Sequence, residues 1–142
     1  MAMLGTLYNS DILTLSASLR NERLDNPSGT SRKVSKLCGS SVEVDVELTD
    51  DRVSDVALRV EACALGQASA AILKAHIIGA TLEELRHARD GLRAMLKEGG
   101  SPPEGRFEQL AFLKGVKDYP PRHQSTLLAF EAAVEAVETV NP

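Results

Sequence analysis

Apolar and polar residues follow different spacings along the chain, and each spacing predicts a different kind of element. Leucines and an isoleucine recur at helical intervals near the start and predict a first helix over residues 4–19. The next stretch, residues 21–36, is polar, and its Asp-Asn-Pro-Ser-Gly run at residues 25–29 predicts a loop. The first part of the chain therefore predicts one helix followed by a long irregular connection.

Strict alternation of apolar and charged residues comes next. Valines and a leucine occupy every second position of residues 42–48, with Glu and Asp between them, and a similar alternation recurs in residues 56–61. This pattern predicts strands with one buried and one exposed face. The turn at residues 49–52 is short, so the two strands are expected to form an antiparallel hairpin. Residues 34–37 are expected to add a third, shorter strand at the edge of this sheet.

The spacing of apolar residues then becomes helical again. An Ala-rich helix over residues 64–78 is expected to end at Gly79, and Thr81-Leu82-Glu83-Glu84 has the sequence of a capping box that opens another helix. The remaining predicted segments are the continuation of that helix to about residue 97, a short helix over residues 107–113, and a last helix that starts near Ser125 after Pro120 and Pro121. Helices therefore dominate the second half of the chain.

Because strands come first and helices later, the order of elements predicts an α+β fold. We expect a small antiparallel sheet of about three strands, packed against a group of helices that are mostly C-terminal. The 142 residues fit a single domain over residues 1–142. Hydrophobic residues make up 43% of the chain and aromatic residues only 4%, so the core is expected to be aliphatic.

The net charge of the chain is −4 at neutral pH. Binding to DNA, RNA or an anionic membrane surface needs a basic surface, so neither nucleic acid nor a membrane is expected as a partner. No apolar run approaches the length of a membrane span, and no basic segment precedes an apolar one at the N-terminus. We therefore expect a cytoplasmic protein.

Three residues are candidates for binding chemistry: Cys38, Cys63 and His123. Cys63 lies where the second predicted strand ends and a helix begins, and a helix N-terminus favours a thiolate. Cys38 precedes Gly39, and glycine permits close approach of the backbone to a ligand. Two alternatives stay open: the thiols can serve as small apolar side chains, and a His in a turn is often exposed and inert. No zinc-finger, phosphate-loop or catalytic-triad pattern is recognised, so no enzyme activity is expected.

The order of these segments resembles the IscU/NifU-type (NifU N-terminal-like) family of iron–sulfur cluster assembly scaffolds. A Cys-Gly pair stands before an alternating strand, and Cys63 follows the hairpin and opens an Ala/Ser-rich helix. A Thr-Leu-Glu-Glu helix start comes next, and a Pro-containing turn then leads to His123 and a final Ala-rich helix. The similarity spans about residues 30–140 and implies a SufE/NifU-like fold.

In that family three Cys, with a His or Asp nearby, hold a [2Fe–2S] cluster or a zinc ion. The resemblance implies that Cys38, Cys63 and His123 bind iron, a [2Fe–2S] cluster or zinc in this chain. The family's third Cys directly follows its His and corresponds to Gln124, and the Asp after the first Cys-Gly corresponds to Ser40. Gln is a poor ligand for soft metals. Two thiolates and one imidazole with an open fourth position would suit zinc.

The resemblance implies a scaffold or carrier that binds the metal or cluster and meets a cysteine desulfurase and acceptor apo-proteins. The alternative, motivated by Gln124 and Ser40, is a binding or regulatory module that keeps the fold but has lost cluster assembly. A third option is a sulfur-accepting transferase that carries a persulfide on Cys63. A homodimer would let a second protomer complete the ligand set, so the oligomeric state stays open.

Overall fold

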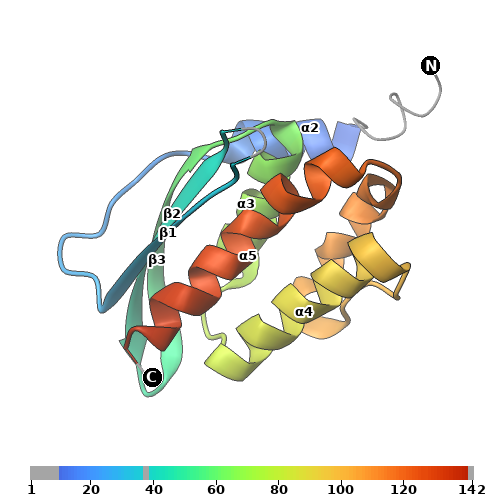
Figure 1. Ribbon diagram of the computed structural model, residues 1–142. Helices are drawn as coiled ribbons and strands as arrows, with labels where there is room; N and C mark the ends of the chain where they lie inside the picture. Colours follow the sequence, from blue (N-terminus) through green and yellow to red (C-terminus); the bar gives the residue numbers. More distant parts are fainter. Residues whose placement is uncertain (1–9, 37–38, 141–142) are drawn as a thin grey trace.

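The computed structural model describes residues 10–36 and 39–140, and Figure 1 shows their arrangement. In chain order the elements are helix α2 (Ser10–Ser18), strands β1 (Gly29–Val34), β2 (Ser41–Thr49) and β3 (Arg52–Glu61), helices α3 (Ala64–His76) and α4 (Leu82–Glu98), the 3₁₀ segments η1 (Gly105–Asp118) and η2 (Pro120–Arg122), and helix α5 (His123–Glu138). The strands form one antiparallel sheet in the order β1-β2-β3. Helices α3 and α5 pack on one face of this sheet, and α4 packs against α5 and η1. The predicted α+β fold is therefore confirmed.

The β2–β3 hairpin forms where the alternation predicts it. Val44 of β2 pairs with Leu58 of β3, and both side chains are fully buried in the core. Strand β3 begins at Arg52 rather than at residue 56, the start that the alternation predicts. A bulge after Glu47 shifts the pairing register, and it interrupts the alternation that would have marked the first part of β3.

Strand β1 spans Gly29–Val34, so the strand predicted over residues 34–37 is wrong in position. The side chains of β1 that face the helices are not bulky apolar ones, because β1 runs directly against α5. At Gly29, an added Cβ atom would collide with the carbonyl oxygen of Ala136 in α5. Further along, Lys33 Nζ lies 2.6 Å from Glu135 Oε2 of the same helix. Strand β1 therefore lacks the apolar alternation that identifies β2 in the sequence.

The opposite face of the sheet carries a cluster of charged residues around the buried Asp45. Arg59 of β3 donates two hydrogen bonds to the Asp45 carboxylate of β2, at 2.8 and 3.0 Å, and its Nε donates to Glu43 at 2.8 Å. Asp45 also accepts from Thr30 Oγ1 at 2.9 Å and from the backbone N–H of Leu24 at 3.1 Å. These contacts hold the segment between α2 and β1 against the sheet.

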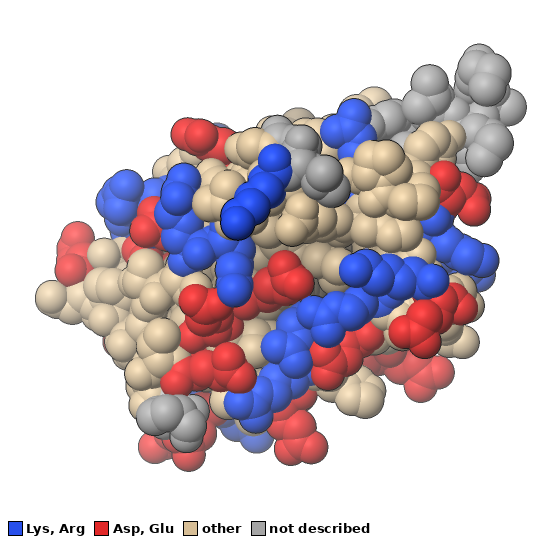
Figure 2. Space-filling view, viewed as in Figure 1, with Lys and Arg blue, Asp and Glu red and all other residues tan. Residues whose placement is uncertain are grey.

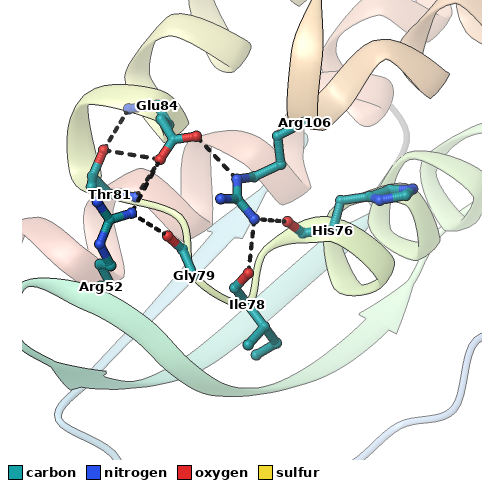
Figure 3. Close-up of polar contacts among 7 residues, drawn as sticks. All are labelled: Arg52, His76, Ile78, Gly79, Thr81, Glu84 and Arg106. Atoms are coloured by element: carbon teal, nitrogen blue, oxygen red, sulfur yellow. Dashed lines mark hydrogen bonds and ion pairs between the residues drawn. The ribbon is translucent and has the colours of Figure 1, made fainter.

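Helix α4 begins at the predicted capping box. Thr81 Oγ1 accepts from the N–H of Glu84, and one carboxylate oxygen of Glu84 accepts from the N–H of Thr81, both at 3.2 Å. Figure 3 shows the other carboxylate oxygen bonded to Arg106, which also donates to the carbonyl oxygens of His76 and Ile78. Arg106 thus joins the end of α3 to the start of α4, and α3 ends at His76 rather than at residue 78.

The short helix predicted over residues 107–113 is a longer 3₁₀ segment, η1. Its buried residues fall at every third position: Phe107, Leu110, Leu113 and Val116. This interval matches the three residues per turn of a 3₁₀ helix, so one side of η1 faces the core throughout. Helix α5 then begins at His123, slightly before the predicted start near Ser125.

The first helix of the described chain, α2, packs against α3 and buries Ile12. The helix was expected over residues 4–19, and residues 1–9 lie outside the described part. Among the described helices, none is both long enough and apolar enough to cross a membrane.

Ion pairs join α4 to α5 at the surface. Arg86 Nη2 lies 2.7 Å from Glu138 Oε2, and Arg93 Nη2 lies 3.3 Å from Glu131 Oε2. Figure 2 shows a diagonal row of Lys and Arg side chains on this face, with Asp and Glu side chains beside it. Since these pairs are partly exposed, each is expected to stabilise the fold by less than about 1 kcal/mol.

Candidate functional site

Cys63 occupies the junction between β3 and α3, as the sequence predicts. It is the N-cap residue of α3, with extended backbone angles (φ −66°, ψ 171°), and no side chain caps the helix there. Its side chain is half-buried. The first turn of a helix leaves backbone N–H groups without intrahelical partners and carries partial positive charge. The sulfur therefore lies at a place that favours an anionic ligand atom.

The side chain of Ser125, in the first turn of α5, contacts Cys63. The distance from Cys63 Sγ to Ser125 Oγ is 3.7 Å, and Ser125 is only 1% exposed. The Ser125 hydroxyl also donates to the carbonyl oxygen of Arg122 at 3.2 Å. Ser125 was not among the residues predicted for the site. A serine in the first turn of a helix ordinarily makes such local bonds to the backbone, so the sequence around it gives no signal of a site.

Close packing of α3 on α5 explains why these two side chains meet. A Cβ atom added at Gly66 in α3 would lie 3.1 Å from the carbonyl oxygen of Ser125 and 2.8 Å from Cβ of Ala62. Only a residue without a side chain fits at this distance. Gly66 therefore lets the first turns of α3 and α5 approach each other beside the Cys63 sulfur.

His123, the predicted imidazole ligand, is buried at the start of α5. Its Nε2 atom lies 3.0 Å from the carbonyl oxygen of Val116 and 3.1 Å from that of Lys117. Carbonyl oxygens only accept hydrogen bonds, so Nε2 carries a proton, and in the neutral form of the ring the lone pair lies on Nδ1. His123 thus fastens the end of η1 to α5, and Nδ1 is the atom that remains for a ligand role.

Gln124 is exposed and points toward the loop after β1. Its Oε1 atom accepts a hydrogen bond of 2.8 Å from Ser35 Oγ. The loop is closed by backbone bonds from the N–H of Ser35 to the carbonyl oxygen of Ser40, at 2.8 Å, and from the N–H of Gly39 to that of Ser35, at 2.9 Å. Cys38 falls within this loop in the sequence but lies outside the described residues. Gln124 therefore ties α5 to the loop that carries the first predicted ligand.

The predicted site residues are thus distributed around the first turn of α5. Ser125 contacts Cys63, and Gln124 is hydrogen-bonded to Ser35 in the loop after β1. His123 faces η1. Within residues 10–36 and 39–140, no three His, Cys, Asp or Glu side chains group closely enough to hold a metal ion. Because Cys38 lies outside this range, the ligand set of Cys38, Cys63 and His123 stays a prediction.

Comparison with known proteins places this arrangement in a family. Residues 7–126 match the family described as NifU-like N terminal domain. The match covers most of the chain, and the chain belongs to this family. The resemblance seen in the sequence is therefore confirmed.

Solved and curated relatives agree with this assignment. One similar solved structure is the crystal structure of a nitrogen-fixing NifU-like protein (N-terminal) from Brucella abortus, which superposes on this chain with a TM-score of 0.95. The two sequences are 43% identical, and the match covers 98% of this chain and 97% of that one. The iron-sulfur cluster assembly scaffold protein IscU of Thermotoga maritima is 24% identical over 95% of both chains. The protein of the same name from Streptococcus pyogenes serotype M1 is 26% identical over 71% of this chain, which spans 64% of that relative's length.

Proposed function

We propose that this protein is a scaffold or carrier in iron–sulfur cluster assembly, which holds iron, a [2Fe–2S] cluster or zinc as its cargo through Cys38, Cys63 and His123. Membership of the NifU-like family and two relatives named as scaffolds support this proposal. The observation that carries it is the position of Cys63, a half-buried thiol at the N-terminus of α3 and beside the first turn of α5.

The chemistry of the site fits such a cargo. Thiolates bind zinc and iron strongly, and positive partial charge at a helix N-terminus lowers the cost of gathering negative charge there. The Nδ1 atom of His123 would supply a nitrogen ligand, since Nε2 is bonded to carbonyl oxygens. Two thiolates and one imidazole leave a fourth coordination position for water or for a partner's ligand, an arrangement typical of zinc sites that stay open.

The proposal implies partners on both sides of the cargo. A cysteine desulfurase would supply sulfur, and acceptor apo-proteins would receive the assembled cluster. The protein itself would bind and hand over its cargo, so we expect no enzyme activity from the isolated chain. A cytoplasmic location and a homodimer that completes the ligand set belong to the same proposal.

Metal content and the visible absorption spectrum of the anaerobically purified protein test the proposal. We expect bound iron or zinc in the wild type, and its loss in Cys38→Ala and in Cys63→Ala. His123→Ala should bind less metal than His87→Ala, a matched control on the exposed face of α4. Wild-type protein free of metal after anaerobic reconstitution, with both Cys variants indistinguishable from it, would contradict the proposal.

One observation favours the alternative of a binding or regulatory module. The two residues that follow His123 are Gln124 and Ser125, and neither side chain contains sulfur. The side-chain oxygen of Gln124 already accepts a hydrogen bond from Ser35. A site with two thiolates would hold a cluster less firmly than a site with the usual four. This alternative would be favoured if the wild type contained no metal and if Cys38→Ala and Cys63→Ala both still bound a partner protein.

A further inference from the structure

The two edges of the sheet differ in how the rest of the chain covers them. Along β3, the N–H of Glu22 donates to the carbonyl oxygen of Leu58 at 2.9 Å. At the start of the same strand, Val53 donates to the carbonyl oxygen of Ala80 at 2.9 Å and accepts from the N–H of Gly79 at 2.7 Å. Strand β1 forms the other edge and pairs with β2 alone. Within the described residues, β1 is therefore the edge that no other segment covers with backbone hydrogen bonds.

The register of β1 shows which backbone groups this edge presents. The N–H of Ser35 donates to the carbonyl oxygen of Ser40 at 2.8 Å and continues the pairing of β1 with β2. In an antiparallel edge strand, the N–H and C=O groups of alternate residues point toward the neighbouring strand and away from it. Counting back from Ser35, the backbone groups of Thr30, Arg32 and Val34 point away from β2. We call this row of donors and acceptors the β1 edge, and such a row can pair with a further strand.

The unpaired charges beside the β1 edge are positive. Arg32 and Lys36 are exposed, and within residues 10–36 and 39–140 neither forms an ion pair. The glutamates nearest to β1, on β2 and α5, are already paired with cations: Glu43 with Arg59, Glu135 with Lys33, Glu131 with Arg93, and Glu138 with Arg86. A strand that approaches the β1 edge therefore meets two cations that lack a counter-charge.

These charges select among the strands that could pair there. An antiparallel second copy of β1 centred on Arg32 would place two arginines opposite each other, and like charges opposite each other destabilise a sheet. A strand with alternating acidic residues would instead place carboxylates beside Arg32. Val34, which is 44% exposed, would pack against an apolar side chain of that strand. We propose that the β1 edge binds an extended acidic segment of a partner protein, which joins the sheet as a fourth strand.

Binding of short fluorescent peptides tests the charge preference. A labelled peptide of alternating Glu and Val is compared with one in which Lys replaces Glu, and fluorescence anisotropy measures both affinities. We expect the acidic peptide to bind, to bind more weakly at high salt, and to lose about tenfold in affinity for Arg32→Glu. Lys114→Glu is the matched control, since Lys114 is an exposed cation on η1, and it should bind the acidic peptide like the wild type.

Backbone pairing is tested separately from charge. Val34→Pro removes an N–H that points away from β2, so it should weaken the acidic peptide about tenfold while the β1–β2 pairing stays intact. Val34→Ala keeps that N–H and should bind within about threefold of the wild type. Circular dichroism checks that both variants fold.

Amide hydrogen exchange, followed by nuclear magnetic resonance, tests the same pairing in the unaltered protein. The amides of Ser31 and Lys33 should be protected without peptide, because they face β2. The amides of Thr30, Arg32 and Val34 should gain protection only when the acidic peptide is present. This measurement decides the question even if Val34→Pro fails to fold.

Three results would overturn the inference. The first is that the acidic peptide does not bind, or binds no better than the basic one. The second is that it binds without new protection at Thr30, Arg32 and Val34, which would place it elsewhere on the surface. The third is a wild-type dimer, measured by analytical ultracentrifugation, that Val34→Pro dissociates, because a second copy would then occupy the β1 edge. None of these results depends on bound metal, so the scaffold proposal is tested independently.

Discussion

Asp45 is a single residue that connects three segments of the chain. The residue is only 4% exposed, yet its carboxylate accepts hydrogen bonds from Arg59 of β3, Thr30 of β1 and the backbone of Leu24. A buried charge is tolerated when a partner of opposite charge and further hydrogen bonds satisfy it. Asp45 therefore contributes to holding the segment before β1 on the sheet.

Replacing Asp45 by Asn should destabilise the fold by about 3 kcal/mol, because the half-buried guanidinium of Arg59 loses its bidentate partner. Asp55→Asn is the matched control, since Asp55 is exposed on the same hairpin and its replacement should cost less than about 0.5 kcal/mol. Urea denaturation followed by circular dichroism measures both. Equal midpoints for the two variants would mean that the Asp45–Arg59 pair contributes no net stability.

The same carboxylate predicts how stability depends on pH. Burial raises the pKa of Asp45, but hydrogen bonds from Arg59, the Leu24 N–H and Thr30 outweigh it and hold this pKa below its ordinary value. A carboxyl whose pKa is lowered by folding stabilises the native state fully above its unfolded pKa of about 4. That contribution is lost as the pH falls from about 4 through the lower folded value, and Asp45→Asn should unfold with a weaker pH dependence in this range.

Single residues also explain how far the sequence could predict the site. Cys63 was located correctly because a strand pattern ends and a helical pattern begins at that residue. The contact between Ser125 and Cys63 was not predicted, because the order of residues along the chain does not show which side of α5 packs against α3. Only the packing of α5 around Gly66 settles that orientation.

At the scale of elements, the hairpin and the helices were predictable, and β1 was not. Alternation marked β2, and a capping box marked α4, because both signals are local. Strand β1 has the sequence Gly-Thr-Ser-Arg-Lys-Val, whose inward positions are small or charged because α5 lies so close. That reason involves a helix at the other end of the chain, so no window of sequence around β1 contains it.

Gly29→Ala should test this explanation of β1. The added Cβ would collide with the backbone of Ala136 and lie within 2.8 Å of side-chain atoms of Thr139 and Val140, so β1 or α5 must shift. We expect a loss of about 3 kcal/mol in the free energy of unfolding, at the upper end of overpacking effects. Arg32→Ala, exposed on the same strand, should cost about 0.5 kcal/mol or less. If the Gly29→Ala protein were as stable as the Arg32→Ala protein, α5 could not pack as closely against β1 as the structure shows.

At the scale of the whole molecule, segments distant in sequence meet around the first turn of α5. The loop after β1 reaches it through Ser35 and Gln124, α3 reaches it through Cys63 and Ser125, and the end of η1 reaches it through His123. A binding site formed by the loop, α3 and α5 together would exist only in the folded chain. Binding of metal at this place should therefore stabilise the entire fold.

Zinc should accordingly raise the unfolding temperature of the metal-free protein. At a zinc concentration about a hundred times the dissociation constant, the stabilisation is about 2.7 kcal/mol, which corresponds to a rise of roughly 8 °C for a domain of this size. Differential scanning calorimetry measures it, and calcium, which prefers oxygen ligands, should give no shift. His123→Ala should unfold at a lower temperature even without zinc, because it loses the hydrogen bonds to Val116 and Lys117, so the zinc-induced shift is the quantity to compare. That shift should vanish in Cys63→Ala, shrink in His123→Ala and persist in His87→Ala; an equal shift in all three would mean that zinc binds elsewhere.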